Sequence, residues 1–347
     1  MSSIHNFARQ FTLFLKRIMF RFINKLILLL IIVSVSSCGS DPLNVKLNNQ
    51  ETHVNIHRSE KMIFNLADSL ESFGEFLPIY SQYVLNIGHP QDAEFKAKLR
   101  QFTEDEDMRT VFDKSEVLFG QGEAMQQDFD QAFSYYRYHF PNQIIPQIVT
   151  NHSGLNYAIF TGDTTLGVGL DMFLGSDFEI YPLIPTMTAY LIRTMAPEYV
   201  VAKSMYGWMQ VRYEENNESS KMLEQMVFHG KLLYSMDALL YGQPDSIKSG
   251  FSEAQLDWCN RNEFNIWSAL IDKDLLYTTD HLSVNKWIEP APFTSGLPKE
   301  SPGRLGRWVG WQMVRAFMDR HPETTLPELF NKYKAQEILN LSKYKPK

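Results

Sequence analysis

The chain has 347 residues, of which 44% are hydrophobic and 13% aromatic. This composition can bury a large core and argues against a disordered chain. Its 33 basic and 40 acidic residues give a formal net charge of −7. Because an acidic surface repels phosphate groups, the charge argues against nucleic-acid binding and against a polybasic dock on anionic lipids.

Residues 1–37 have the organisation of a bacterial lipoprotein signal peptide. An apolar stretch at 26–33 follows Arg17, Arg21 and Lys25, and small residues precede Cys38 in the sequence VSSC. This pattern predicts cleavage before Cys38 and acylation of its thiol. The alternative is a short transmembrane anchor, but the apolar stretch is well below the roughly 20 residues that a membrane-spanning helix needs.

We expect translation to start at Met19, which opens a compact basic region, and the mature chain to begin at Cys38 with 310 residues. The leader carries five basic and no acidic residues, so the mature net charge is near −12. Membrane attachment must then come from the lipid itself. Cys259 is the only other cysteine, which excludes an intramolecular disulfide in the mature chain. It is expected to be a buried filler and not a nucleophile.

Residues 38–58 are polar and contain a proline, as expected of a tether, although the alternation at Val54 and Ile56 favours an edge strand there. Residues 59–145 show helical periodicity and form a predicted N-terminal helical region. The acidic run at 103–107 is expected to start a helix, because negative charge is stabilised at a helix N-terminus. A second amphipathic helix over 127–136 should end at Phe140 and Pro141.

Residues 146–347 are expected to combine strands and helices. Short alternating segments at 146–150, 156–161 and 165–171 predict three strands in an antiparallel meander. Helical patterns then continue through Trp208, and further helices are expected at 222–240, 253–272 and 303–319. The predicted fold class is α+β, predominantly helical with a small antiparallel sheet.

Three segments resemble the gliding-motility lipoprotein B (GldB) family of the Bacteroidetes. They are Gly169 to Gly175 followed by Tyr181 and Pro182, then HGKLLY at 229–234, then PGRLGRWVGW at 302–311. The resemblance implies a lipid-anchored cell-envelope protein required for surface gliding, within machinery that also supports type IX secretion. Its implied partners are the membrane, through the N-terminal lipid, and other gliding-machinery or envelope proteins. The absence of an acidic run after Cys38 favours a body facing the periplasm.

The element order also resembles zinc metallopeptidases of the gluzincin kind. Such enzymes need the motif HExxH, whose two histidines hold the ion while the glutamate polarises its water, and this motif is absent from the sequence. If the helix near residues 200–209 takes the metal-helix position, Lys203 replaces the catalytic glutamate. His229 and Gly230 stand where related enzymes have Glu-Gly. These replacements predict a degenerate metallopeptidase-like architecture with no catalytic residue, metal or cofactor.

A binding cleft is expected at Asp171, Lys203, His229 and Tyr234, where a peptide or protein segment would be held without being cut. One alternative is a peptidase with a rearranged zinc site that uses His229 with His152 or His139. Another is a scaffold that uses its outer surface only. His229 on an apolar helix is also compatible with a purely structural role. Asp171 lies near Asp163, Asp177 and Glu179, which suggests either a calcium site or simple turn formation.

The segment 303–311 contains a further candidate surface. Gly303, Gly306 and Gly310 lie three and four residues apart, a spacing that brings them onto one part of a helix and permits close approach of another element. Glycine costs a helix roughly 1 kcal/mol relative to alanine, so close packing must compensate. The bulky neighbours of these glycines are expected to form a packing or partner surface, namely Arg304, Arg307 and Trp308.

Overall fold

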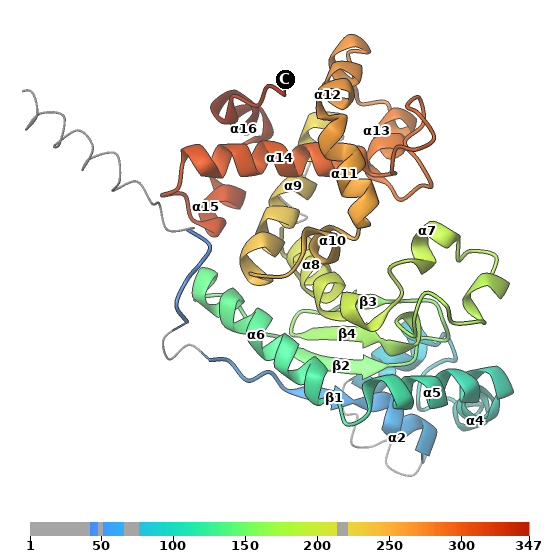
Figure 1. The fold of residues 1–347 in the computed structure, drawn as a ribbon. Coiled ribbons are helices and arrows are strands. Elements are labelled where there is room, and N and C mark those ends of the chain that lie inside the picture. Colours follow the sequence, from blue (N-terminus) through green and yellow to red (C-terminus); the bar gives the residue numbers. More distant parts are fainter. Residues whose placement is uncertain (1–41, 48–50, 66–75, 214–220, 347) are drawn as a thin grey trace, which may run out of the picture. The chain divides into compact units, whose positions relative to one another are not determined.

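The computed structural model describes residues 42–47, 51–65, 76–213 and 221–346. The chain divides into two units after Val45, and all elements described below belong to the unit that begins at Lys46. The predicted α+β class, predominantly helical, is confirmed: one four-stranded sheet accompanies many helices (Figure 1). Within the described residues, no helix has the length and apolar character needed to cross a membrane.

The first part of the unit is mostly helical, as its periodicity predicts. Asp105 accepts a hydrogen bond from the Met108 N–H and caps the helix that begins at Glu106, so the expected start in the acidic run is confirmed. The helix predicted around 127–136 ends before Phe140, also as expected. The helices of this part are α2 (Ser59–Asn65), α3 (Phe76–Ile79), the π-helix η2 (Tyr80–Val84), α4 (Phe95–Glu104), α5 (Glu106–Phe119) and α6 (Glu123–His139).

The sheet is mixed, so the predicted antiparallel meander is wrong in its pairing. Its strands, β1 (Ile56–Arg58), β2 (Gln147–Asn151), β3 (Ile159–Thr161) and β4 (Thr165–Gly169), lie in the order β1-β2-β4-β3. β2 pairs in parallel with both β1 and β4, and only β3 and β4 form an antiparallel hairpin. β2 and β4 are buried along nearly their whole lengths, as is typical of parallel strands.

The connection between β2 and β3 explains this order. Ser153 and Leu155 each donate a main-chain hydrogen bond to the Asp171 carboxylate, at 2.8 and 2.7 Å. Asp171 lies in the 3₁₀ turn η3 (Leu170–Met172) that directly follows β4. The loop is therefore held at the end of β4, and β3 pairs with the far edge of that strand and not with β2. Apolar alternation reports the buried face of a strand but not its direction.

The second half of the predicted tether is part of the folded body. Val54 is buried, and its N–H donates to Asp130 Oδ1 on α6 at 2.8 Å. The Thr52 N–H donates to Ser134 Oγ on the same helix, also at 2.8 Å. The expected edge strand near Ile56 is confirmed as β1. Docking on α6 thus begins at about residue 52.

The remaining helices gather around α9, which is buried over almost its whole length because its sequence is apolar on nearly every face. Figure 1 shows α14 crossing α9. α8 contacts β3 and β4 as well as α9. The elements are η4 (Tyr181–Leu183), α7 (Ala189–Ile192), η5 (Pro197–Tyr199), α8 (Val200–Tyr213), α9 (Met222–Leu239), α10 (Asp245–Ser249), α11 (Glu253–Arg261), α12 (Glu263–Asp272), α13 (His281–Ile288), α14 (Leu305–Arg320), α15 (Leu326–Asn331) and α16 (Ala335–Ser342).

Glycines set the distance between α9 and α14. A Cβ atom on Gly310 would lie 1.8 Å from the carbonyl oxygen of Met226, and one on Gly230 would lie 2.3 Å from the carbonyl of Gly310. No side chain fits in either place, so the two backbones touch directly. Gly303 precedes α14 and is not on it, contrary to the expected helix span. Its missing side chain leaves room for the carbonyl oxygen of Ala291.

Candidate functional site

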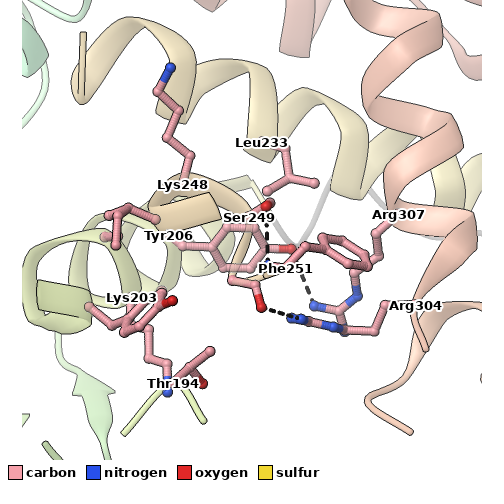
Figure 2. A pocket seen from close by; sticks show the side chains of 14 residues that line it. Thr194, Lys203, Tyr206, Leu233, Lys248, Ser249, Phe251, Arg304 and Arg307 are labelled. Carbon is pink, nitrogen blue, oxygen red and sulfur yellow. Dashed lines mark hydrogen bonds between the residues drawn. The ribbon is translucent and has the colours of Figure 1, made fainter. Parts of the chain in front are cut away.

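A cavity of about 160 Å³ lies where α8, α9, α10 and the start of α14 meet (Figure 2). Four basic side chains contribute to its wall: Lys203, Lys248, Arg304 and Arg307. None of its lining residues is acidic. In a chain with an excess of carboxylates, this gathering of one sign of charge creates a local positive potential. We call this cavity the basic cavity.

Two of the four cations are neutralised by carboxylates. Lys248 Nζ lies 3.3 Å from Asp237 Oδ1 and 3.5 Å from Asp245 Oδ1, and Figure 2 shows its side chain directed away from the two arginines. Arg307 Nη2 lies 3.5 Å from Glu289 Oε2. In the described part of the chain, Lys203 and Arg304 form no ion pair with a carboxylate. These two partly buried cations therefore dominate the charge of the basic cavity.

Arg304 is placed by the backbone just before α14. It adopts a left-handed conformation, with φ at 61°, and serves as the residue preceding the first helical turn. Its guanidinium lies over the Phe251 ring, 5.0 Å from the ring centroid, and donates to the Gly250 carbonyl at 3.2 Å. Burial and the neighbouring charge of Arg307 lower the pKa of Arg304 to about 10. Arg304 still carries its charge at neutral pH.

Lys203 comes from the first turn of α8 and lines the basic cavity together with Arg304. Its Nζ is 5.3 Å from the centroid of the Phe173 ring. Burial, then the charges of Arg304 and Arg193, lower the pKa of Lys203 to about 7. The ammonium group is therefore close to its titration point at neutral pH, which makes its charge sensitive to whatever occupies the basic cavity.

His229 lies directly behind the cavity wall. Its Nδ1 is 2.6 Å from the Tyr206 hydroxyl oxygen, and the two rings are stacked with an interplanar angle of 3°. Burial, then the charges of Arg307 and Arg304, lower the pKa of His229 well below its ordinary value. The imidazole is therefore neutral at pH 7. Tyr206, on the helix that the sequence comparison places at the metal-helix position, therefore faces His229.

An ionic network whose central member, Asp237, is buried fixes α14 against α9 and α10. Asp237 on α9 accepts hydrogen bonds from Trp311 Nε1 at 2.9 Å and from Arg315 Nε at 2.8 Å. Arg315 also pairs with Asp245 on α10, at 2.9 Å. These paired groups hold the helices whose ends supply Lys248 and Arg304 to the wall. Removing one partner of such a network costs about 3–5 kcal/mol.

The four residues of the predicted cleft do not all meet. Lys203 lines the basic cavity, and His229 contacts it through Tyr206. Asp171 is fully buried, and its carboxylate accepts hydrogen bonds from the 153–155 loop. Tyr234 is buried on α9, and neither residue lines the cavity. Burial, only partly opposed by these hydrogen bonds, raises the pKa of Asp171 to about 6.

The predicted surface at the start of α14 divides into two groups. Gly303, Gly306, Gly310 and Trp308 are buried, so the structure gives them a packing position that no partner reaches in the folded protein. Arg304 and Arg307, between them in sequence, line the basic cavity. The glycine spacing in the sequence signals close packing. It does not signal that the intervening arginines point into a cavity.

The histidines proposed for a rearranged zinc site lie in different surroundings. His152 packs against Phe64 and Phe112, and its Nε2 is 2.9 Å from Ser115 Oγ, whereas His229 stacks on Tyr206. Among the described residues, no three side chains of the His, Cys, Asp and Glu types form a metal-binding group. The acidic residues around Asp171, which are among the described residues, therefore form no such group. Cys38, the predicted lipidation site, lies outside the described residues.

Sequence reasoning missed the wall residues that α10 and its following loop supply. Lys248, Phe251 and the Gly250 carbonyl belong to no recognisable motif, and they reach the basic cavity only through the packing of α10 on α9. Thr194 and Tyr206 were likewise not identified as cavity residues. The cluster SIKSGF at 246–251 ends a short helix with a glycine at φ 67°, a signal for a turn and not for a site.

The family model described as gliding motility protein GldB matches residues 40–346, which is nearly the whole chain. No curated protein and no solved structure matches the chain significantly.

Proposed function

The chain belongs to the gliding motility protein GldB family, and we propose that it acts in the gliding machinery as a non-enzymatic binding or scaffolding component of the cell envelope. In this proposal a lipid on Cys38 attaches it to the membrane, with the body facing the periplasm. The basic cavity is the binding site. The observation that carries the proposal is the pair of cations, Lys203 and Arg304, which face a cavity with no acidic lining residue.

The residues of α8 support binding without catalysis. Tyr206 of α8 faces His229 on α9, and Lys203 lines the basic cavity from the same helix, at positions that we compare with the metal-binding helix of a gluzincin. Neither a lysine amine nor a tyrosine hydroxyl already bonded to His229 is among the usual ligands of zinc, so both are poor replacements for the imidazoles of a metal site. The same positions suit recognition, because they combine charge, a hydroxyl group and aromatic surface in one cavity.

The cellular test replaces the native gene by cavity variants in a gliding bacterium that carries it. Arg304→Gln and Lys203→Gln should abolish or strongly reduce spreading on agar, because each removes one of the two cations without a carboxylate partner. Lys299→Gln is the matched control, since Lys299 is an exposed lysine that does not line the basic cavity. Immunoblots must show equal protein levels. Normal gliding by both cavity variants would show that the cavity is not the functional site.

A photo-crosslinking amino acid at Leu233, which lines the basic cavity, tests whether the site is occupied in the envelope. We expect a crosslinked adduct that Arg304→Gln diminishes. The alternative, a zinc-dependent peptidase, predicts stoichiometric zinc in native protein and peptide cleavage that a chelator stops. Detection of both would replace the binding proposal by the enzymatic one.

A further inference from the structure

A second cavity, of about 180 Å³, adjoins the basic cavity. Thr194, Lys203, Phe251 and Arg304 line both. Arg193 contributes to the second one, which again has no acidic lining residue. Lys203 and Arg304 thus stand at the junction of two cavities, with a third cation beside them.

The three cations at the junction are held by neutral groups. Arg193 and Arg304 both donate to the Gly250 carbonyl oxygen, and Lys203 lies over the Phe173 ring. In the described parts of the chain, none of the three forms an ion pair with a carboxylate. A carbonyl satisfies a donor but cancels no charge. Lys248 and Arg307, by contrast, have carboxylate partners.

Like charges gathered away from water destabilise one another. The lowered pKa of Lys203 has this origin, because burial and the charges of Arg304 and Arg193 all act in the same direction. An anion bound at the junction would reverse this effect, because its negative charge would stabilise the charged form of Lys203 and raise the pKa. Two guanidinium groups and an ammonium offer more donors than Gly250 can accept, and the planar guanidinium fork matches the two oxygens of a carboxylate or phosphate.

The rest of the wall suits an apolar group. Ala202, Leu233, Ile247 and Phe251 line the basic cavity, and the Arg304 guanidinium already stacks on Phe251. The cavity volume of about 160 Å³ is comparable with that of engineered cavities, of about 150 Å³, that bind benzene in other proteins. A ring or a short branched chain therefore fits beside the charged junction.

We propose that the junction of Arg193, Lys203 and Arg304 binds the oxyanion of a small organic acid, a carboxylate or phosphate whose ring-sized apolar group enters the basic cavity beside Phe251 and Leu233. This inference rests on the binding role proposed above and adds the chemistry of the ligand. A free acid and the carboxyl end of a polypeptide share this chemistry.

The test is isothermal titration calorimetry on the full chain purified in detergent. Benzoate and phenyl phosphate are the anionic probes, and benzamide is the neutral probe of the same shape as benzoate. At least one anion should bind ten times or more tighter than benzamide, because a charge-assisted contact contributes roughly 1.5–3 kcal/mol. This comparison needs no variant, so it cannot be confounded by misfolding.

Variants locate the site. Arg304→Gln and Lys203→Gln should each weaken binding of the anion about tenfold, the amount expected for loss of one charge-assisted contact. Lys248→Gln, which removes a cavity lysine already paired with carboxylates, should change the affinity by less than about threefold. Circular dichroism establishes that each variant is folded. Equal effects of all three substitutions would show that general charge, and not the junction, attracts the anion, and would overturn the proposal.

A tripeptide that ends in phenylalanine distinguishes the two sources of the oxyanion, a free acid and the carboxyl end of a polypeptide. It is tested with a free carboxyl end and with a C-terminal amide. A preference for the free acid by the same factor of ten supports a polypeptide end as the ligand, whereas binding of benzoate alone supports a free small acid. Benzamide binding as tightly as the anions would overturn the inference but leave the binding role intact. If no probe binds, the inference fails, and the gliding and crosslinking tests still decide the proposed function.

Discussion

At the scale of single residues, the basic cavity is a place where charge opposes stability. Lys203 is held in the folded state beside Arg304 and Arg193, and its pKa is about 7 instead of its ordinary value of 10.5. A folded-state pKa below the unfolded value means that the charged form is disfavoured by folding. The penalty is complete below about pH 7 and diminishes as the pH rises toward 10.5. Functional sites commonly reduce stability in this way.

Lys203→Met is therefore expected to raise the melting temperature. The increase should be largest at pH 6, where wild-type Lys203 is charged in both states, and should shrink between pH 7 and pH 10. Scanning calorimetry across this range measures it. Lys248→Met is the control, because that lysine pairs with Asp237 and Asp245 and its loss should not stabilise the protein. A lower melting temperature for Lys203→Met at pH 6 would contradict the assigned charge penalty.

The sequence could identify part of this site and not the rest. Lys203 and His229 are found by asking what replaces a metal-binding motif, a comparison that needs only residue order. Arg304 and Arg307 occur between glycines and a tryptophan whose spacing indicates packing, so their position on a cavity wall stays hidden. Lys248 and Phe251 reach the site through contacts between α10, α9 and α14, and such contacts have no local signature.

At the scale of secondary-structure elements, the α9–α14 contact determines where the cavity cations stand. Gly310 lets the two backbones meet at Met226, and α14 then presents Arg304 at its first turn. Gly310→Ala should destabilise the protein by at least about 2 kcal/mol. Alanine favours a helix by roughly 1 kcal/mol over glycine, but a Cβ atom 1.8 Å from a backbone oxygen forces the helices apart. Overpacking typically costs about 1–3 kcal/mol, and we expect the upper end of that range or more because the obstacle is backbone, which leaves a net loss of at least about 2 kcal/mol.

Urea denaturation followed by circular dichroism measures this change. Gly162→Ala is the matched control, because the nearest atom to its added Cβ, Thr165 Cβ, lies at an ordinary 3.9 Å, and its effect should stay within about 0.5 kcal/mol. The Gly310 variant should also lose affinity for the anionic probe, since Arg304 moves with α14. An unchanged midpoint for Gly310→Ala would show that the helices separate at little cost.

Helices were more predictable than strand pairing for a physical reason. A helix is specified by periodicity and caps within its own segment, and Asp105 and Phe140 mark ends that the structure confirms. The direction of β2 relative to β4 depends on the loop bound by Asp171, which is a contact across 16 residues or more. The docking of Thr52 on α6 joins residues 82 positions apart. No local pattern contains such information.

At the scale of the whole molecule, the proposed membrane attachment is a lipid on Cys38. The net charge near −12 predicted for the mature chain opposes binding of the body to anionic headgroups, so the proposal gives the lipid the main part in attachment. Cys38→Ser should therefore move the protein from the membrane fraction to the soluble fraction and abolish labelling by radioactive palmitate. Ultracentrifugation of lysed cells and autoradiography measure the two effects.

The matched control for this prediction is the other cysteine. Cys259 is fully buried on α11, and burial raises its pKa to about 12, so its thiol is unreactive. Cys259→Ser should keep both the membrane fraction and the palmitate label. Retention of both by Cys38→Ser would contradict the lipoprotein interpretation and require another anchor.

The docking of residues 52–58 on the folded body limits the distance between that body and a lipid on Cys38. Thirteen residues lie between Cys38 and Thr52, which is the first of the described residues to bond to α6, so 14 residue steps join the two. At roughly 3.3–3.6 Å per fully extended residue, the segment from Cys38 to Thr52 spans at most about 50 Å. If Cys38 is acylated, the basic cavity stays near one bilayer. Its greatest distance from that bilayer is the length of this segment plus the width of the body, and a ligand must come within that distance to bind.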